Sequence, residues 1–222
     1  MAVDRALVIA GLRSRLQALS AVRRDEHWSS GWPELDRALG GGFAPGAVHE
    51  LVDGCPAGIA TTVALRLAAR GASNSNIILY IDLCRELYPP GVEAVGVPLD
   101  KLLILRPEKP LDALWAAEQA LRCRRIAALV MPLTRLAPAA SRRLQLAAES
   151  GGGLAFVVRP LARLEPTFAA TRLQVDPLPG TPLRVRVAVH KQRHQPRQAA
   201  REVILALDSD GGLAPAARRS AG

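Results

Sequence analysis

The sequence predicts an α/β protein built on a largely parallel central sheet flanked by helices. Between residues 47 and 160, short apolar runs alternate with helical segments at least four times, which is typical of buried parallel strands joined by crossover helices. After residue 172, apolar and polar residues alternate between Pro and Gly turns, which predicts antiparallel edge strands. Hydrophobic residues make up 49% of the 222 residues but aromatic residues only 4%. We therefore expect a single, aliphatic core.

The N-terminal part of the chain, residues 1–30, is expected to lie outside this core. Residues 3–22 have the pattern of an amphipathic helix, with an apolar face formed by Leu7, Leu12, Leu16 and Leu19. A charged connector, 23–30, follows it. The helix either packs on its own core or forms a protein interface. The length of the connector favours the interface, including self-association.

The core is expected over residues 31–212. A short helix at 33–39 should end at the glycines that follow it, Gly40 to Gly42, where positive φ is easily adopted. Strands are then expected at 47–52, 76–83, 101–107, 127–133 and 154–160, and helices at 61–70, 111–123 and 138–150, with a helix or turn within 90–102. The edge strands are expected at 171–178, 183–193 and 201–212, and a disordered tail at 213–222.

Composition excludes several classes of protein. Three cysteines, 29 and 39 residues apart, have neither metal-ligand spacing nor the pattern of a disulfide framework. No leader-like or membrane-spanning apolar run is present, so a cytoplasmic location is expected. The few aromatic residues argue against a stacking platform for single-stranded nucleic acid.

The net charge of +9 comes from 29 Lys and Arg against 20 Asp and Glu, and only three of the cations are lysines. This excess indicates either attraction to a polyanion or an acidic protein, or a merely solvated basic surface.

A phosphate-binding loop is expected where the strand at 47–52 meets the helix that follows it. The working pattern is G-x-x-x-x-G-K-[ST], in which backbone amides and the lysine hold the phosphates and the hydroxyl binds Mg²⁺. The aligned residues are Gly54, Gly58, Ile59, Ala60 and Thr61. Ile59 stands at the second glycine of the pattern and Ala60 at the lysine. These replacements predict no nucleotide hydrolysis and no bound cofactor or metal.

Four segments together resemble the RecA ATPase core over residues 31–212. They are the G-x-x-x-L-D-x-x-L-G-G-G segment from Gly31, the Tyr80-Ile81-Asp82 strand, the segment from Gly96 that contains LLILRPEKPLDALWAAEQALR, and the C-terminal strands over 187–212. The catalytic glutamate of that family would stand at Cys84, and its Mg²⁺-organising aspartate at Met131-Pro132. The long DNA-binding loop of the family is shortened between 160 and 171. We expect that nothing anionic remains where Mg²⁺ or the attacking water would be held, so the chain is not an enzyme.

A small, Arg-rich RecA core without an ATPase site is similar to the ImuA family of bacterial translesion-synthesis accessory proteins. This resemblance implies a role in the SOS response to DNA damage, as an adaptor in mutagenesis. It implies as partners an ImuB-type Y-family-like protein, an error-prone DnaE-type polymerase and RecA itself. The alternatives are a RecA paralogue that acts directly on DNA, and a SulA-like inhibitor of cell division.

Two groups of basic residues are candidates for contact with DNA or an acidic partner. The first lies on the expected edge strands and the loop between them and consists of Arg184, Arg186, Lys191, Arg193, Arg197 and Arg201. Such side chains position a phosphate backbone without reading its sequence. The alternative for this group is a solvated sheet edge whose cations discourage edge-to-edge pairing. The second group is Arg142 and Arg143, on the helix after the degenerate aspartate site.

Overall fold

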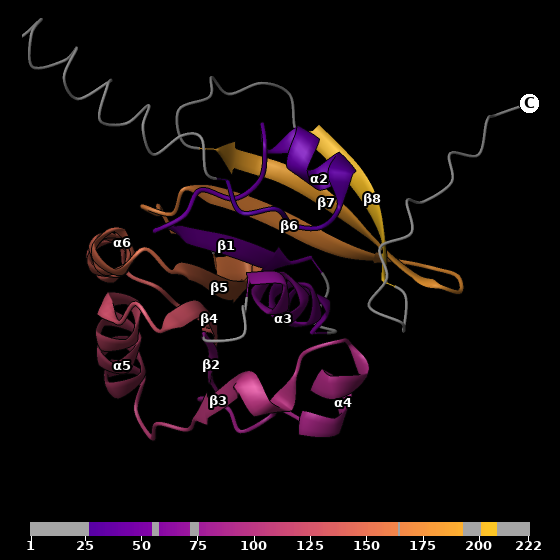
Figure 1. Cartoon of the computed structure of the whole chain (residues 1–222). Coiled ribbons are helices and arrows are strands. Elements are labelled where there is room, and N and C mark those ends of the chain that lie inside the picture. The colour runs from indigo at the N-terminus through magenta and orange to yellow at the C-terminus, as the bar shows by residue number, and fades with distance from the viewer. Residues whose placement is uncertain (1–26, 55–57, 72–75, 164, 193–200, 208–222) are drawn as a thin grey trace, which may run out of the picture.

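The computed structural model describes residues 27–54, 58–71, 76–163, 165–192 and 201–207. These residues form an eight-stranded sheet with the order β3-β2-β4-β5-β1-β6-β7-β8 (Figure 1). The strands from β3 to β6 pair in parallel, whereas β7 and β8 pair antiparallel to their neighbours. The strands are β1 Val48–Asp53, β2 Ile77–Ile81, β3 Leu102–Leu105, β4 Ile126–Pro132, β5 Leu154–Pro160, β6 Thr171–Leu178, β7 Leu183–Gln192 and β8 Arg201–Leu207. The predicted fold class is confirmed.

Helices cover both faces of this sheet. They are α2 Pro33–Ala38, α3 Ile59–Gly71, α4 Pro89–Ala94, α5 Pro110–Arg122 and α6 Pro138–Gly151, with 3₁₀ turns η1 Leu99–Lys101 and η2 Leu161–Arg163. Four of the helices, α2, α4, α5 and α6, begin with proline and lack a side-chain N-cap. Proline suits this position because its fixed φ is already helical and the first amides of a helix have no partner within it. Proline therefore sets where these helices begin.

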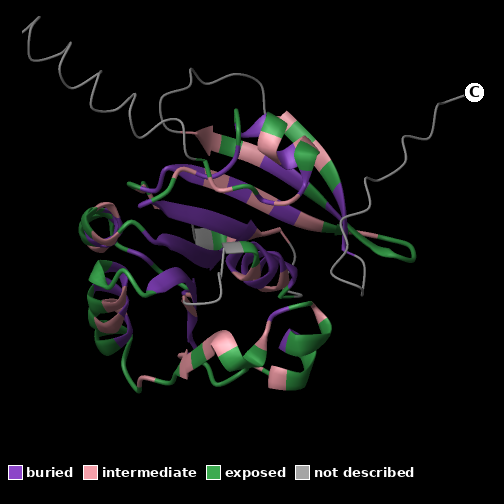
Figure 2. Cartoon of the chain, viewed as in Figure 1, coloured by how far each residue is buried: buried purple, intermediate pink, exposed green. Residues whose placement is uncertain are grey.

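Two aliphatic clusters form the core, one on each face of the sheet. The first gathers α2 and α3 over the face that includes Leu51 of β1, and it extends to β7 and β8. The second gathers α5 and α6 over the face that includes Val48. Figure 1 shows α5 and α6 side by side on one face and α3 on the other. The central strands β1, β4 and β5 are almost completely buried, as Figure 2 shows.

The segment before β1 is held against the far end of the sheet. Trp28 and Phe43 form an isolated antiparallel bridge, and a Cβ on Gly42, whose φ is +124°, would lie 2.5 Å from the Trp28 carbonyl oxygen. Glycine is therefore required there. The amide of Gln192 on β7 donates to the Leu39 carbonyl at 2.6 Å, and the guanidinium of Arg201 on β8 donates to the Ala38 carbonyl at 3.1 Å.

Some predicted boundaries differ from those observed. α3 begins at Ile59 rather than at 61, because Asp53 accepts a hydrogen bond from the Ala60 amide and completes an earlier first turn. β3 spans only Leu102–Leu105 within the expected 101–107. The expected N-terminal helix with Leu7, Leu12, Leu16 and Leu19, and the tail at 213–222, lie outside the described residues.

Candidate functional site

The first glycine of the expected phosphate loop is packed against the neighbouring strand. The Gly54 amide donates to the Val175 carbonyl of β6 at 3.1 Å. A Cβ at this position would lie 1.7 Å from Oδ1 of Asp176. The lack of a side chain at position 54 is therefore required by contact with a carboxylate of the same chain, and phosphate binding is not needed to explain it. Residues 55–57 lie outside the described part of the loop.

The next positions of the loop belong to the hydrophobic core. Gly58 has a φ of +69° and leads directly into α3. Ile59 is 7% exposed and Ala60 is fully buried, and both pack in the cluster around α3. Thr61 is half-buried on the first turn of α3. A cationic side chain is thus replaced by a methyl group inside the core.

The N-terminus of α3 is occupied by a carboxylate from the preceding strand. Asp53, the last residue of β1, accepts a hydrogen bond from the Ala60 amide at 2.8 Å. Burial raises the pKa of the Asp53 carboxyl above its usual value, and this hydrogen bond opposes the rise. The expectation that nothing anionic remains at this place was wrong. Sequence reasoning missed Asp53 because it compared only the residues of the motif itself.

This geometry is unfavourable for phosphate. Free amides and the positive end of the helix dipole normally make such an N-terminus a site for anions. Here Asp53 already takes the Ala60 amide and adds a negative charge. A phosphate at the same place would meet like-charge repulsion without a lysine to offset it.

The positions expected to have lost the catalytic carboxylates are also engaged in packing. Cys84 is exposed, and Met131 is completely buried at the end of β4. Asp82, beside the position of the missing glutamate, is 2% exposed. It accepts hydrogen bonds from the Glu86 amide and from Nε of Arg106, both at 3.0 Å. Asp82 therefore ties the loop after β2 to the end of β3. Within the described residues, no group of three or more His, Cys, Asp or Glu could hold a metal ion.

The basic residues predicted on the edge strands are divided between the two faces of the sheet. Arg184 and Arg186 are exposed on one face, opposite Leu178 and Asp176 of β6. Arg201 pairs with Val189, and paired residues share a face, so Arg201 lies on the other face, where it binds the end of α2. The expectation that Arg201 extends the patch of Arg184 and Arg186 is thus not met.

The other members of that group contribute little to a common surface. Lys191 donates from Nζ to the Thr167 carbonyl at 2.7 Å, beyond a register shift between β6 and β7. Arg193 and Arg197 lie outside the described residues. The surface around Arg184 and Arg186 also carries Asp176. It is therefore mixed in charge rather than purely basic.

Arg142 and Arg143 lie together on α6, and each has a specific contact. Nη2 of Arg143 lies 2.7 Å from Oε1 of Glu118, a buried residue of α5. The guanidinium of Arg142 lies 5.7 Å from the ring centroid of Phe168, which is 47% exposed. Since both side chains remain largely accessible, this corner offers cationic and aromatic groups to a partner.

A buried ion network supports the short connection between β5 and β6. Glu50 of β1 and Arg159 of β5 are fully buried, and Nη1 of Arg159 lies 3.5 Å from Oε1 of Glu50. Arg172 of β6 binds Oε2 of Glu50 through Nε at 2.7 Å, and Glu165 pairs with Arg159. Burial lowers the pKa of the Arg159 guanidinium, while the charge of Glu50 opposes that effect. The available signal was a single charge inside each of two apolar strands.

A second buried polar group lies on the opposite face of β1. His49 is fully buried, with Nδ1 2.9 Å from the Thr171 hydroxyl and Nε2 3.1 Å from the Ala44 carbonyl oxygen. Because a carbonyl can only accept, Nε2 carries the proton and the hydroxyl donates to Nδ1. Burial lowers the pKa of His49 to about 4. The imidazole is therefore neutral, in keeping with a non-catalytic role.

Comparison with known proteins places these features in a wider context. The model of the RecA N-terminal domain family matches residues 14–157, which is more than half of the chain. A RecA protein of Nostoc punctiforme is 39% identical over 99 residues, which cover 45% of this chain and 27% of that protein. A RecA protein of Staphylococcus aureus strain JH9 is 36% identical over 101 residues, which cover 45% of this chain and 29% of that protein. The matched stretch thus spans less than a third of these relatives.

Proposed function

The chain belongs to the RecA N-terminal domain family, and we propose that it is a non-hydrolysing accessory protein that uses the RecA fold as a scaffold. The observation that carries this proposal is the contact between Asp53 and the Ala60 amide at the start of α3. A carboxylate occupies the amide that a phosphate would need, and the lysine position is a buried alanine. Binding and hydrolysis of ATP are therefore disfavoured for both electrostatic and steric reasons.

The process that we propose is SOS-induced translesion DNA synthesis, with the chain as an ImuA-like cytoplasmic adaptor of mutagenesis. Its partners would be an ImuB-type Y-family-like protein, an error-prone DnaE-type polymerase and RecA. Support comes from the RecA likeness of the N-terminal two thirds and from the loss of motif residues at the phosphate loop. Among the described helices, none is long and apolar enough to span a membrane.

An ATP turnover assay tests the non-enzymatic part of the proposal. Purified protein is incubated with ATP and Mg²⁺, with and without single-stranded DNA, beside a RecA protein as positive control. We expect phosphate release at the level of the buffer blank. Mg²⁺-dependent turnover that is abolished by Thr61→Ala would overturn the proposal, because Thr61 stands at the hydroxyl of the phosphate motif.

The adaptor role is tested in cells that carry the gene. Deletion should lower the frequency of damage-induced mutation, and the tagged chain should co-purify with the Y-family-like protein after DNA damage. An unchanged mutation frequency together with intact recombination would contradict the role. Lower recombination with unchanged mutagenesis would instead select the DNA-acting RecA paralogue.

That second candidate is favoured by one specific observation, the exposure of Arg184 and Arg186 on the same face of β7. Replacing both arginines by glutamine should weaken DNA binding and lower the slope of log K against log salt by about 1.4 for single strands, since each phosphate contact contributes about 0.7. A matched control replaces Arg122 and Arg124, both exposed near the end of α5, and so makes the same change in net charge. Equal effects of the two double variants would exclude a specific DNA site at Arg184 and Arg186.

A further inference from the structure

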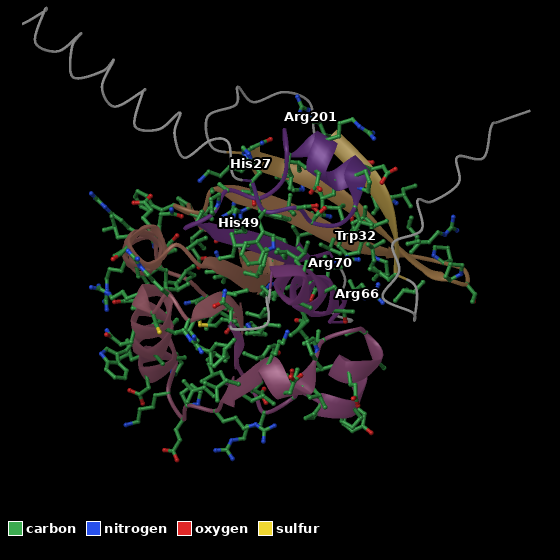
Figure 3. All side chains as sticks on the ribbon, in the orientation of Figure 1. His27, Trp32, His49, Arg66, Arg70 and Arg201 are labelled. Carbon is green, nitrogen blue, oxygen red and sulfur yellow. The ribbon has the colours of Figure 1, made fainter. Side chains whose placement is uncertain are left out.

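A cavity of about 370 Å³ lies at the C-terminal half of α3, away from the phosphate loop at its N-terminus. Its described lining comes from three separate segments, namely the start of α2, the helix α3 and the turn between α4 and η1. Figure 3 labels the three largest side chains of this lining, Trp32, Arg66 and Arg70. The lining residues are Trp32, Arg66, Ala69, Arg70, Val95, Gly96 and Pro98.

The chemistry of the cavity is set by two guanidinium groups. Arg66 and Arg70 are four residues apart on α3 and therefore share a face of the helix. Arg66 is 8% exposed and lies at the base of the cavity, whereas Arg70 is exposed and lies at its mouth. The described lining contains no acidic side chain. Planar guanidiniums of this kind bind carboxylates through two parallel hydrogen bonds.

The remaining walls are rigid and apolar. Trp32 is 3% exposed, and its indole N–H donates to the Ala206 carbonyl at 3.3 Å, which fixes the ring. Val95 and Pro98 form the opposite wall. Gly96 between them, with a φ of +84°, leaves the backbone accessible. An anionic group in this cavity would thus lie beside an apolar surface.

We propose that the cavity binds a partner polypeptide by receiving an acidic side chain between Arg66 and Arg70, with an adjacent apolar side chain against Val95 and Pro98. This inference rests on the proposed adaptor function and names the chemistry of one contact. The volume is at the small end for sites of small molecules but fits one or two side chains. Arg and Trp are the residues that most often dominate protein interfaces, and a net charge of +9 attracts acidic surfaces.

The test follows the indole N–H signal of Trp32 by NMR of the ¹⁵N-labelled full chain. Single Trp→Phe changes at Trp28 and Trp115 identify that signal. The probe is the peptide acetyl-Leu-Glu-Leu-Glu-amide, and parallel titrations use the Gln analogue of the peptide, inorganic phosphate and ATP. We expect the Glu peptide to shift the signal of Trp32 and the Gln peptide to leave it unchanged.

Charge reversal at the mouth of the cavity provides the variant. Arg70→Glu should weaken the Glu peptide at least about tenfold, which corresponds to about 1.4 kcal/mol. Arg70 is chosen because it is exposed and its change is tolerated better than one at buried Arg66. The matched control is Arg122→Glu at the exposed end of α5, with the same change in net charge, and it should bind the peptide as the wild type does.

Four outcomes would overturn the proposal. These are an equal shift by the Gln peptide, equal weakening by Arg122→Glu, tighter binding of phosphate or ATP than of the peptide, or a peptide shift only in the variant Asp208→Asn/Asp210→Asn. The last would assign the cavity to carboxylates of this same chain, which follow β8 in the sequence. None of these readouts involves ATP turnover or mutagenesis, so failure here is distinguishable from failure of the proposed function.

Discussion

Glu50 and Arg159 form an ion pair between the neighbouring strands β1 and β5, and both side chains are completely buried. Arg172 and Glu165 complete the network around this pair. The network connects the centre of the sheet with the short segment that leads from β5 to β6. A charged cluster therefore holds the fold at a place where the rest of the core is aliphatic.

Removing one partner of this network should strongly destabilise the fold. Glu50→Gln leaves Arg159 and Arg172 without their shared carboxylate, and breaking a buried pair in this way lowers the free energy of unfolding by about 3–5 kcal/mol. Urea unfolding followed by circular dichroism measures the change. Glu202→Gln, at an exposed position of β8, is the control and should change stability by less than about 0.5 kcal/mol. Equal stability of the two variants would show that the network contributes nothing.

The stability of the fold should fall as the pH drops from about 6.5 to about 4 because of His49. Burial lowers the pKa of His49 in the folded chain from 6.5 to about 4, so the unfolded chain takes up a proton in this range and the folded chain does not. The resulting loss is about 3 kcal/mol, from about 1.36 kcal/mol for each pKa unit. Urea unfolding of the wild type and His49→Gln at a series of pH values measures it. The difference between the two curves should vary with pH, and parallel curves would contradict the assignment.

Restoring the phosphate motif should fail while Asp53 remains. Ile59→Gly/Ala60→Lys supplies the missing glycine and lysine, but the Asp53 carboxylate still accepts the hydrogen bond of the residue 60 amide. Adding Asp53→Asn removes that charge and should tighten the binding of ATP at least about tenfold relative to the double variant. Calorimetric titration with Mg-ATP measures both affinities, and circular dichroism checks that each variant is folded. Equal affinities would show that Asp53 does not block the site.

The contact between Gly54 and Asp176 predicts a pair of compensating substitutions. Gly54→Ala places a Cβ against Oδ1 of Asp176 and should destabilise the fold by about 1–3 kcal/mol, as overpacking commonly does. Gly54→Ala in an Asp176→Ala background should cost much less. Thermal unfolding of the four proteins of this cycle gives the coupling energy. A coupling of zero would mean that the glycine is needed for another reason.

The parallel core was predictable from the sequence because each of its strands is an apolar run of the right length. The segments that became β2, β4 and β5 are nearly free of charge, and prolines precede four of the helices. These local signals act over a few residues, and a single sequence contains them in full.

Contacts between distant residues were harder to predict. The face on which Arg201 lies depends on the register between β7 and β8, and the loop between these strands hid that register from sequence reasoning. Asp53 was missed because its role depends on the direction in which β1 ends. Likewise, nothing in the sequence pairs Glu50 with Arg159, because strands far apart in the chain become neighbours only in the folded sheet.

The burial of Ala60 has a consequence for evolutionary reversal. A lysine at this fully buried position would carry its charge into the core, and a glycine at position 59 would remove a packed isoleucine. Either change alone destabilises the protein while Asp53 still repels phosphate. A lineage with this loop would therefore have to cross several harmful intermediates before nucleotide binding returned, so selection acting on one mutation at a time would preserve the loss.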